Sequence, residues 1–320
     1  MSKVQVHEKA AQIQAEVSKA VVGKQDIIEK VLTAILAGGH ILLEDIPGVG
    51  KTTLALAFSK SMGLDFQRVQ FTPDVVPSDI TGFTMYDKNS GIFQYRPGAV
   101  MCNFFLADEI NRTSSKTQAA LLEVMQEGRV TVDGETHELP EPFVVMATQN
   151  PIGTAGTQML PEAQLDRFMV KLSMGYPDFE AQIHILKDRE KEDPLEQIRH
   201  VVTREEVTGM IGAARAVYVD EKIYRYITTL AEATRNHPYI RLGISPRGAL
   251  ALCNMAKAGA CVKGRDYVVP EDIIRIFPDV CRHRLILSPK AQLADLTADK
   301  ILAEILVQNR ASKSDDGVNQ

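Results

Sequence analysis

The chain has 320 residues, of which 45% are hydrophobic and 24% are charged, so it is long enough for two domains and too apolar for a disordered protein. Its 36 Lys and Arg against 41 Asp and Glu give a net charge of −5, which argues against the broad basic surface that non-specific nucleic-acid binding needs. Its four cysteines have no paired spacing, as expected in a reducing compartment. Residues 1–18 lack the apolar segment of a signal peptide, and we expect a cytoplasmic protein without a membrane span.

The first half of the chain alternates short apolar runs with amphipathic segments, a pattern typical of a parallel sheet flanked by helices. The apolar runs predict strands at 41–44, 66–71, 103–107, 143–148 and 168–173. Helical periodicity between them predicts helices at 25–37, 51–62 and 114–126. Two further stretches predict β-hairpins because turn sequences lie near their centres; these are 83–95 and 129–139.

From residue 176 onward strand patterns are rare and amphipathic helices dominate. The predicted helices are 178–191, 203–215, 220–235, 246–260, one that begins at Pro270, and 293–308. Ser245 and Pro246 form a typical helix start, with Ser as the N-cap and Pro at the first helical position. The sequence therefore predicts an α/β domain over residues 1–175, an all-helical domain over 176–312 and a frayed polar tail over 313–320.

A glycine-rich segment, Pro47-Gly48-Val49-Gly50-Lys51-Thr52-Thr53, lies between the first predicted strand and the next helix. Glycines let backbone N–H groups turn inward and a helix N-terminus favours negative charge, so this frame predicts a phosphate-binding loop. Lys51 would reach the β- and γ-phosphates, and the Thr52 hydroxyl would bind Mg²⁺. The usual G-x-x-x-x-G-K-[ST] pattern begins with glycine, where this chain has Asp45. The alternative is a glycine-rich turn in an ordinary α/β unit.

Two carboxylates, Asp108 and Glu109, follow the strand predicted at 103–107. Ligands of a parallel sheet lie at the carboxyl ends of its strands, so the pair is expected beside the phosphate loop. Asp108 suits Mg²⁺ binding, and Glu109 suits polarisation of a water that attacks the γ-phosphate. Asn150 follows the next strand, where its amide could hold that water. The alternatives are a helix N-cap for the acids and a turn before Pro151 for Asn150.

Two arginines could bring positive charge to such a site, Arg167 in the segment 160–168 and Arg247 at the start of the helix predicted at 246–260. Phosphoryl transfer gains from a cation near the charge that develops on the γ-phosphate, whether the same chain or a partner supplies it. The spacing does not distinguish this role from a surface ion pair, which is the commonest role of arginine.

Five motifs follow one another along the chain: Pro-Gly-Val-Gly-Lys-Thr at 47–52, Ala-Asp-Glu-Ile-Asn-Arg at 107–112, Ala-Thr-Gln-Asn-Pro at 147–151, Leu-Pro-Glu-Ala-Gln-Leu-Asp-Arg-Phe at 160–168 and Ser-Pro-Arg at 245–247. In this order they resemble the MoxR family of AAA+ ATPases, and the resemblance extends from about Val21 to Arg284. Members of that family tolerate a residue other than glycine at the position of Asp45. The resemblance implies an AAA+ P-loop core with a five-stranded parallel sheet, a helical lid, and ATP with Mg²⁺ bound between neighbouring subunits of a ring, typically a hexamer.

The resemblance also implies a role for each candidate residue. Val22 and Gly23 lie in the stretch that lines the adenine pocket, and the two hairpins correspond to inserts that project toward the ring pore or a client. The remaining correspondences are Lys51 and Thr52 with Walker A, Asp108 and Glu109 with Walker B, Asn150 with sensor 1, Arg167 with the arginine finger that acts on a neighbour's ATP, and Arg247 with sensor 2.

From this resemblance we expect an Mg²⁺-dependent ATPase that couples hydrolysis to chaperone-like remodelling or maturation of a protein client, often with a partner that bears a von Willebrand factor A domain. Three other functions stay open: a nucleic-acid-associated AAA+ motor, a nucleotide-gated scaffold and a chelatase-type motor subunit. The acidic composition argues against the nucleic-acid motor, and the presence of Glu109 and Asn150 argues against a scaffold without hydrolysis. A chelatase motor would share the same machinery.

Overall fold

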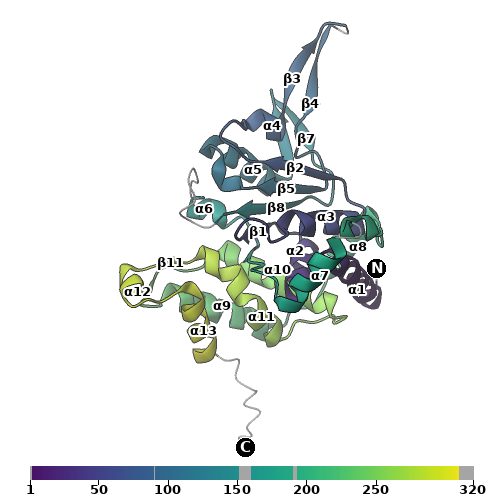
Figure 1. The fold of residues 1–320 in the computed structure, drawn as a ribbon. Helices are drawn as coiled ribbons and strands as arrows, with labels where there is room; N and C mark the ends of the chain where they lie inside the picture. The colour runs from purple at the N-terminus through teal and green to yellow at the C-terminus, as the bar shows by residue number, and fades with distance from the viewer. Residues whose placement is uncertain (1, 90, 151–159, 190–192, 310–320) are drawn as a thin grey trace, which may run out of the picture.

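The computed structural model describes residues 2–89, 91–150, 160–189 and 193–309. Its centre is a five-stranded sheet in the order β2-β5-β8-β1-β9, in which every neighbouring pair is parallel (Figure 1). The strands are β1 (Ile41–Glu44), β2 (Phe66–Gln70), β5 (Phe104–Asp108), β8 (Val144–Gln149) and β9 (Val170–Leu172). The predicted five-stranded parallel sheet is therefore confirmed, with strand ends that differ from the prediction by at most two residues.

Side chains of the sheet alternate between two hydrophobic clusters, one on each face. In β5, Phe104 and Leu106 join one cluster, whereas Phe105 and Ala107 join the other. This alternation follows from the two-residue repeat of a strand, and burial on both faces explains why the strands read as continuous apolar runs. The first cluster packs against α1 (Lys3–Ala20), α2 (Gln25–Leu36) and α3 (Lys51–Ser61), and the second against α4 (Pro77–Thr81) and α5 (Ser115–Glu127).

Helix α1 is absent from our sequence prediction. Its apolar residues Val6, Ala10, Ile13 and Val17 recur every three or four positions and are buried, and Ser2 caps the helix through a capping box. The many charged residues between them obscure this periodicity in the sequence.

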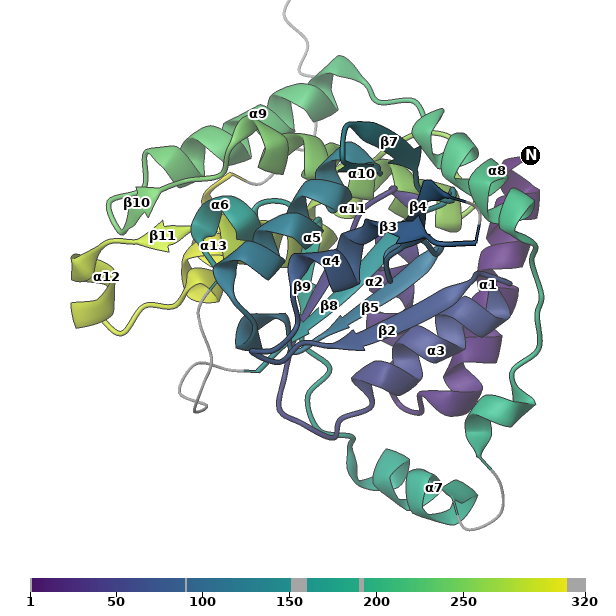
Figure 2. The same ribbon diagram turned by 90° about the horizontal axis from the view of Figure 1, so that it is seen from above.

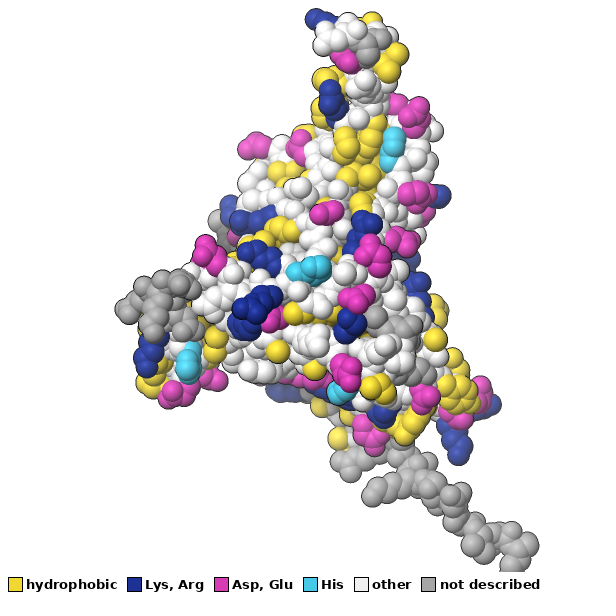
Figure 3. Space-filling view, turned by 90° about the vertical axis from the view of Figure 1, so that its right-hand side faces the viewer, with side chains coloured by type: hydrophobic (Ala, Val, Ile, Leu, Met, Phe, Trp, Pro, Cys, Tyr) yellow, Lys and Arg dark blue, Asp and Glu magenta, His cyan; other side chains and the backbone are white. Residues whose placement is uncertain are grey.

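Two antiparallel hairpins extend from the sheet in the regions where the sequence predicts them. They consist of β3 (Gly82–Asp87) with β4 (Ile92–Pro97), and β6 (Arg129–Val132) with β7 (Glu135–Glu138). The rings of Tyr95 and His137 stack with centroids 3.8 Å apart, so the two hairpins are in direct contact. Figure 3 shows apolar side chains over the projecting part of the molecule, and Phe83, Tyr86 and Phe93 of the first hairpin are each about half exposed or more.

The second half of the described chain is mostly helical. Its helices are α7 (Phe179–Arg189), α8 (Arg204–Arg215), α9 (Glu221–Arg235), α10 (Pro246–Val262), α11 (Pro270–Cys281), α12 (Pro289–Leu293) and α13 (Ala298–Gln308). A two-stranded sheet of β10 (Ile240–Leu242) and β11 (Ile286–Leu287) lies on one side of it (Figure 2). A helical lid region is therefore present, whereas the boundary near residue 175 stays a prediction and the tail at 313–320 lies outside the described residues.

The helix predicted at 293–308 is present from Ala298 to Gln308, but its predicted start is wrong. Helix α12 ends at Leu293, Asp295 adopts a left-handed backbone with φ of 51°, and α13 begins at Ala298 after the N-cap Thr297, whose hydroxyl accepts the Lys300 N–H. The Thr297 hydroxyl accepts a backbone N–H of the first turn of α13. In a continuous helix that N–H would donate to a carbonyl oxygen of the preceding turn. Within the described residues, no helix is both long enough and apolar enough to cross a bilayer.

The two halves share one hydrophobic cluster. Helix α10 packs against both α1 and α2, and buried residues from these helices, from one face of the sheet and from the lid helices all belong to that cluster. The lid is therefore attached through an apolar interface and not only through its linker.

His40, directly before β1, connects three elements of the core. Its Nδ1 accepts the Val145 N–H of β8 at 3.0 Å, and its Nε2 lies 3.0 Å from the Met125 carbonyl oxygen at the end of α5. The ring also meets Phe143 edge-on with centroids 5.8 Å apart. Burial lowers the pKa of His40 to about 4, so the neutral ring is the form that the fold holds.

We predict that His40 makes folding stability depend on pH. The pKa is lower in the folded chain than the ordinary value of 6.5, so the contribution is complete above pH 6.5 and is lost as the pH falls toward 4. At pH 5 the loss is about 2 kcal/mol. Urea unfolding of wild type and His40→Gln at pH 7.5 and pH 5 measures it, and the pH-dependent drop should be smaller in the variant. His200→Gln, at an exposed position, is the control and should keep the wild-type drop.

Candidate nucleotide site

The loop between β1 and α3 is open toward solvent at its glycines. Gly48 and Gly50 have φ angles of 83° and 94°, in the left-handed region that favours glycine. A Cβ added at Gly48 would meet no atom within 4 Å, and one added at Gly50 would meet only the Met174 side chain, at 3.9 Å. The space over the loop is therefore free for a group that approaches the backbone closely.

The structure explains why Asp45 stands where the usual pattern has glycine. Its φ is not left-handed, so the position does not require glycine. Its buried carboxylate accepts hydrogen bonds from the Ser173 hydroxyl at 3.1 Å, from Met174 N–H at 2.5 Å and from Gly175 N–H at 2.8 Å. Asp45 therefore fixes the segment that follows β9 against the phosphate loop.

Lys51 is the first residue of α3 and is buried, with 7% of the residue exposed. Its ammonium group donates to the carbonyl oxygens of Asp45 at 2.7 Å and Ile46 at 3.2 Å. Burial lowers the pKa of this group, and nearby carboxylates oppose that effect. Thr52, the next residue of α3, is half-buried. The Lys51 ammonium is thus held at the base of the loop by two neutral carbonyl oxygens. An anionic phosphate is a stronger acceptor and can replace them.

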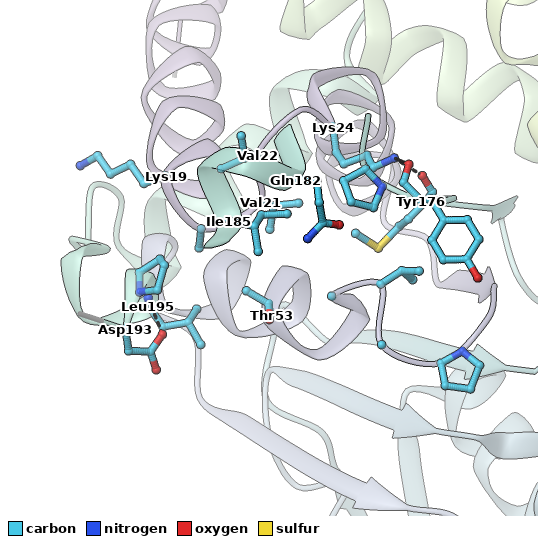
Figure 4. Close-up of a pocket in the computed structure, with 18 residues that line it drawn as sticks. Lys19, Val21, Val22, Lys24, Thr53, Tyr176, Gln182, Ile185, Asp193 and Leu195 are labelled. Carbon is cyan, nitrogen blue, oxygen red and sulfur yellow. Dashed lines mark hydrogen bonds between the residues drawn. The ribbon is translucent and has the colours of Figure 1, made fainter. Parts of the chain in front are cut away.

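A cavity of about 590 Å³ lies between the loop and the start of the lid (Figure 4). On the loop side it is lined by Pro47, Gly48, Val49, Gly50 and Thr53, and on the opposite side by residues that include Val21, Val22, Gln182, Ile185 and Leu195. Lys24 donates to the carbonyl oxygens of Met174 and Tyr176, which also line the cavity. Gly23 is adjacent and packs on α7, because an added Cβ there would come within 2.8 Å of Ala181.

The acid pair lies at the carboxyl end of β5. Asp108 Oδ1 accepts the Thr148 hydroxyl at 2.6 Å, and Asp108 Oδ2 forms an ion pair with Arg68 of β2 at 2.7 Å. Glu109 has a left-handed backbone with φ of 57°, and its N–H donates to the Thr148 hydroxyl at 2.8 Å. The carboxyl ends of three neighbouring strands thus meet in one hydrogen-bonded group.

Asn150 and Arg112 both contact the Glu109 carboxylate. Asn150 Nδ2 donates to Glu109 Oε1 at 3.0 Å, and Arg112 Nη1 donates to Oε2 at 3.0 Å. The predicted proximity of Asn150 to the acid pair is therefore observed. Arg112, for which the sequence indicates no clear role, is an ion-pair partner of Glu109 in this structure.

Arg68 is missed by the sequence analysis. It lies between Gln67 and Val69 on an edge strand, where an exposed arginine has no distinguishing motif. Only the strand order, which pairs Arg68 with Leu106 of β5 two residues before Asp108, reveals its neighbour.

The two candidate arginines lie apart from the cavity. Arg167 is half-buried, and its Nε donates to Gln126 Oε1 near the end of α5 at 3.2 Å. Arg247 is exposed in the first turn of α10. Neither is among the residues that line the cavity, and the same holds for Lys51, Thr52, Asp108, Glu109 and Asn150.

Comparison with known proteins agrees with this geometry. Residues 40–170 match the ATPase family associated with various cellular activities (AAA), and residues 232–305 match the AAA lid domain. The chain is 49% identical to YeaC of Bacillus subtilis over 91% of each chain. It is 40% identical to the chaperone MoxR1 of Mycobacterium tuberculosis, over 91% of this chain and 78% of that protein. The chain belongs to the MoxR family of AAA+ ATPases.

A solved structure also resembles this MoxR-family chain closely. The crystal structure of a Cytophaga hutchinsonii protein, described there as an ATPase, is 39% identical and superimposes with a TM-score of 0.88 over 95% of both chains. Together with the phosphate loop and acid pair, these relatives identify the chain as an ATP hydrolase of the AAA+ type. The predicted family, fold and enzyme class are thereby confirmed.

We predict that Asp45→Gly, which restores the usual glycine of the pattern, is harmful in this chain. It removes a charged acceptor of four hydrogen bonds, three from Ser173, Met174 and Gly175 and one from the Ile46 N–H, so the free energy of unfolding should fall by about 3 kcal/mol. The loosened segment lines the cavity, so the dissociation constant of a fluorescent ADP analogue should rise about tenfold. Asp45→Asn, which keeps one acceptor oxygen, should lose less of both. A Gly variant as stable as wild type would contradict the proposed contact.

Proposed function

We propose that this chain is an Mg²⁺-dependent ATPase that works as a ring, and that it uses hydrolysis to remodel or mature a protein client in the cytoplasm. The observation that carries the proposal is the convergence of an open glycine loop, a buried Lys51 and the Asp108–Glu109 pair at one edge of a parallel sheet. This edge is where ligands of open α/β sheets bind.

The residues present fit a nucleotide. The open space over Gly48 suits phosphate oxygens bound by backbone N–H groups, and the apolar walls at Val22 and Ile185 suit a base. Lys51 would exchange its two carbonyl acceptors for phosphate oxygens. The Thr52 hydroxyl and the Asp108 carboxylate are oxygen donors of the kind Mg²⁺ prefers, and the ion would neutralise phosphate charge when bound.

Glu109 is the proposed general base. Its carboxylate is held by Asn150 on one oxygen and by Arg112 on the other, so its direction is fixed by two neighbours. We propose that Glu109 takes the proton of the attacking water while the Asn150 amide orients that water. Each carboxylate oxygen keeps a second lone pair beside its hydrogen bond from Asn150 or Arg112, and this lone pair would accept the proton.

The ring is proposed from the family resemblance, in which Arg167 corresponds to an arginine that serves a neighbour's nucleotide. Phosphoryl transfer gains from a cation that a partner supplies in this way. A hexamer is the size that the family resemblance implies. The exposed apolar hairpin of β3 and β4 would then contact the client, and a protein with a von Willebrand factor A domain is the proposed partner.

We predict that Glu109→Gln abolishes turnover but not binding. The amide keeps the shape of the side chain but cannot accept the proton, so ATP turnover should fall at least about 100-fold. The dissociation constant of a fluorescent ATP analogue should change less than about twofold. Glu123→Gln, at an exposed position of α5, should leave both values unchanged. Undiminished turnover in Glu109→Gln would remove Glu109 as the base.

Complementation between two inactive variants tests the ring. Arg167→Ala and Glu109→Gln should each be inactive alone, because one lacks the proposed finger and the other the base. Mixed in equal amounts and allowed to exchange subunits, they should recover about a quarter of wild-type turnover, since about that share of random interfaces joins an intact base to an intact finger. No recovery, in a mixture shown by native mass spectrometry to contain mixed oligomers, would show that Arg167 does not act across subunits.

A further inference from the structure

The lid binds both carboxylate oxygens and the backbone carbonyl oxygen of Asp166, the residue before Arg167. Asp166 Oδ1 accepts the Arg284 Nε–H at 2.7 Å, and Oδ2 accepts the Ser245 hydroxyl at 2.9 Å. Its backbone carbonyl oxygen accepts a third hydrogen bond from Arg284 Nη2 at 3.1 Å. Both partners belong to the second half of the chain, so Asp166 is hydrogen-bonded to the lid although it lies in the first half.

Arg284 holds the residues that follow in the same way. Its Nη2 donates to the Phe168 carbonyl oxygen at 2.7 Å, and its Nη1 donates to the Met169 carbonyl oxygen at 3.2 Å. The Arg284 side chain is 2% exposed, so these bonds are shielded from water and salt. On the other side of Arg167, helix α6 (Glu162–Leu165) also packs against the lid turn at 282–284 (Figure 1).

Immediately after this segment the backbone forms hydrogen bonds with the sheet. Met169 N–H donates to the His40 carbonyl oxygen at 2.8 Å, and β9 then pairs with β1 from Val170 onward. The segment also contacts the core, because Leu160 and Phe168 are buried in the cluster on one face of the sheet and Arg167 donates to Gln126 of α5. It is therefore held from both sides, and a rotation of the lid relative to the sheet would strain the backbone around Arg167.

On the lid side, Ser245 joins this contact to the helix that carries Arg247. The Ser245 hydroxyl donates to Asp166 and accepts the Gly248 N–H at 3.1 Å, as the N-cap of α10. Gly248 also packs on Arg284, because an added Cβ there would lie 2.9 Å from Arg284 Cδ. Arg247 is in this same first turn, so one hydroxyl lies between the two candidate arginines.

We propose that Asp166 is a positioning residue that couples the two arginines, so that the nucleotide state read by Arg247 in its own subunit sets the position of Arg167 at the neighbour's site. The proposal rests on the roles of Arg167 and Arg247 under the proposed function. It goes further because it names the contact that transmits a change of nucleotide from one site to the next.

Hydrogen exchange tests this coupling without measuring activity. In the wild-type protein, saturating ADP should change the exchange of segment 243–250 and of segment 160–168. In Ser245→Ala the hydroxyl that joins Asp166 to α10 is lost while the two hydrogen bonds from Arg284 stay, so the response of 160–168 should weaken clearly while that of 243–250 remains. A full response of 160–168 in Ser245→Ala, or no response of 160–168 in wild type, would overturn the proposal.

A matched control separates this effect from the loss of a helix cap. Thr203 caps α8 in the lid by accepting the Glu206 N–H, and its contacts lie within the lid. Thr203→Ala should lower the melting temperature to a similar degree as Ser245→Ala but keep the exchange response of 160–168. If both variants lose the response equally, a general loosening of the lid explains it and the specific coupling is refuted.

Turnover provides a second readout. The Hill coefficient for ATP should exceed 1 in wild type and Thr203→Ala, and it should fall toward 1 in Ser245→Ala and Asp166→Asn with a dissociation constant for ADP close to that of wild type. A Hill coefficient in Ser245→Ala equal to that of wild type would contradict the proposal. Failure of the proposed function is seen separately, because Arg167→Ala would then leave the rate at saturating ATP unchanged.

Discussion

The arrangement of the acid residues depends on a single buried hydroxyl group. Thr148, at the end of β8, donates to Asp108 Oδ1 and accepts the Glu109 N–H, so it joins the ends of two neighbouring strands. The second of these bonds supports the left-handed backbone of Glu109, which a non-glycine residue rarely adopts. That turn directs the Glu109 carboxylate toward Asn150. Since a strand reverses its faces at every residue, a shift of one position between β5 and β8 would separate all of these groups.

Each of the two acids is also paired with an arginine, Asp108 with Arg68 and Glu109 with Arg112. Both arginines are partly exposed, so their interactions with the acids are screened by solvent and are weak enough to exchange. The acids are nevertheless held in position before any ligand arrives. Preorganisation of this kind reduces the reorganisation that a reaction would otherwise require. The carboxylates are therefore fixed in position, whereas their arginine partners can be replaced. Lys51 is likewise fixed, and its two carbonyl acceptors can be replaced.

The sequence predicts the sheet well because its strands are buried on both faces and because glycine and acidic residues mark their ends. It also predicts which residues meet at the carboxyl edge, since that follows from the parallel order alone. Other features depend on contacts between distant segments. The ion pair of Arg68 requires knowledge that β2 and β5 are neighbours, and the role of Asp45 requires the position of Ser173 and the two residues after it. The break at Asp295 is a local event, but its left-handed residue is not the usual glycine.

The apolar cluster that joins α1, α2 and α10 has a consequence for how such a chain can be divided. A fragment that ends near residue 175 would keep α1 and α2 but lose the helix that covers them, which would leave a continuous apolar surface in water. A fragment that begins there would lose the opposite side of the same interface. Deletion of either part would therefore lower the solubility of the remaining part. This loss would mask any effect of the deletion on activity. We therefore expect the nucleotide-binding core and the lid to unfold as one cooperative unit, although in sequence they are two.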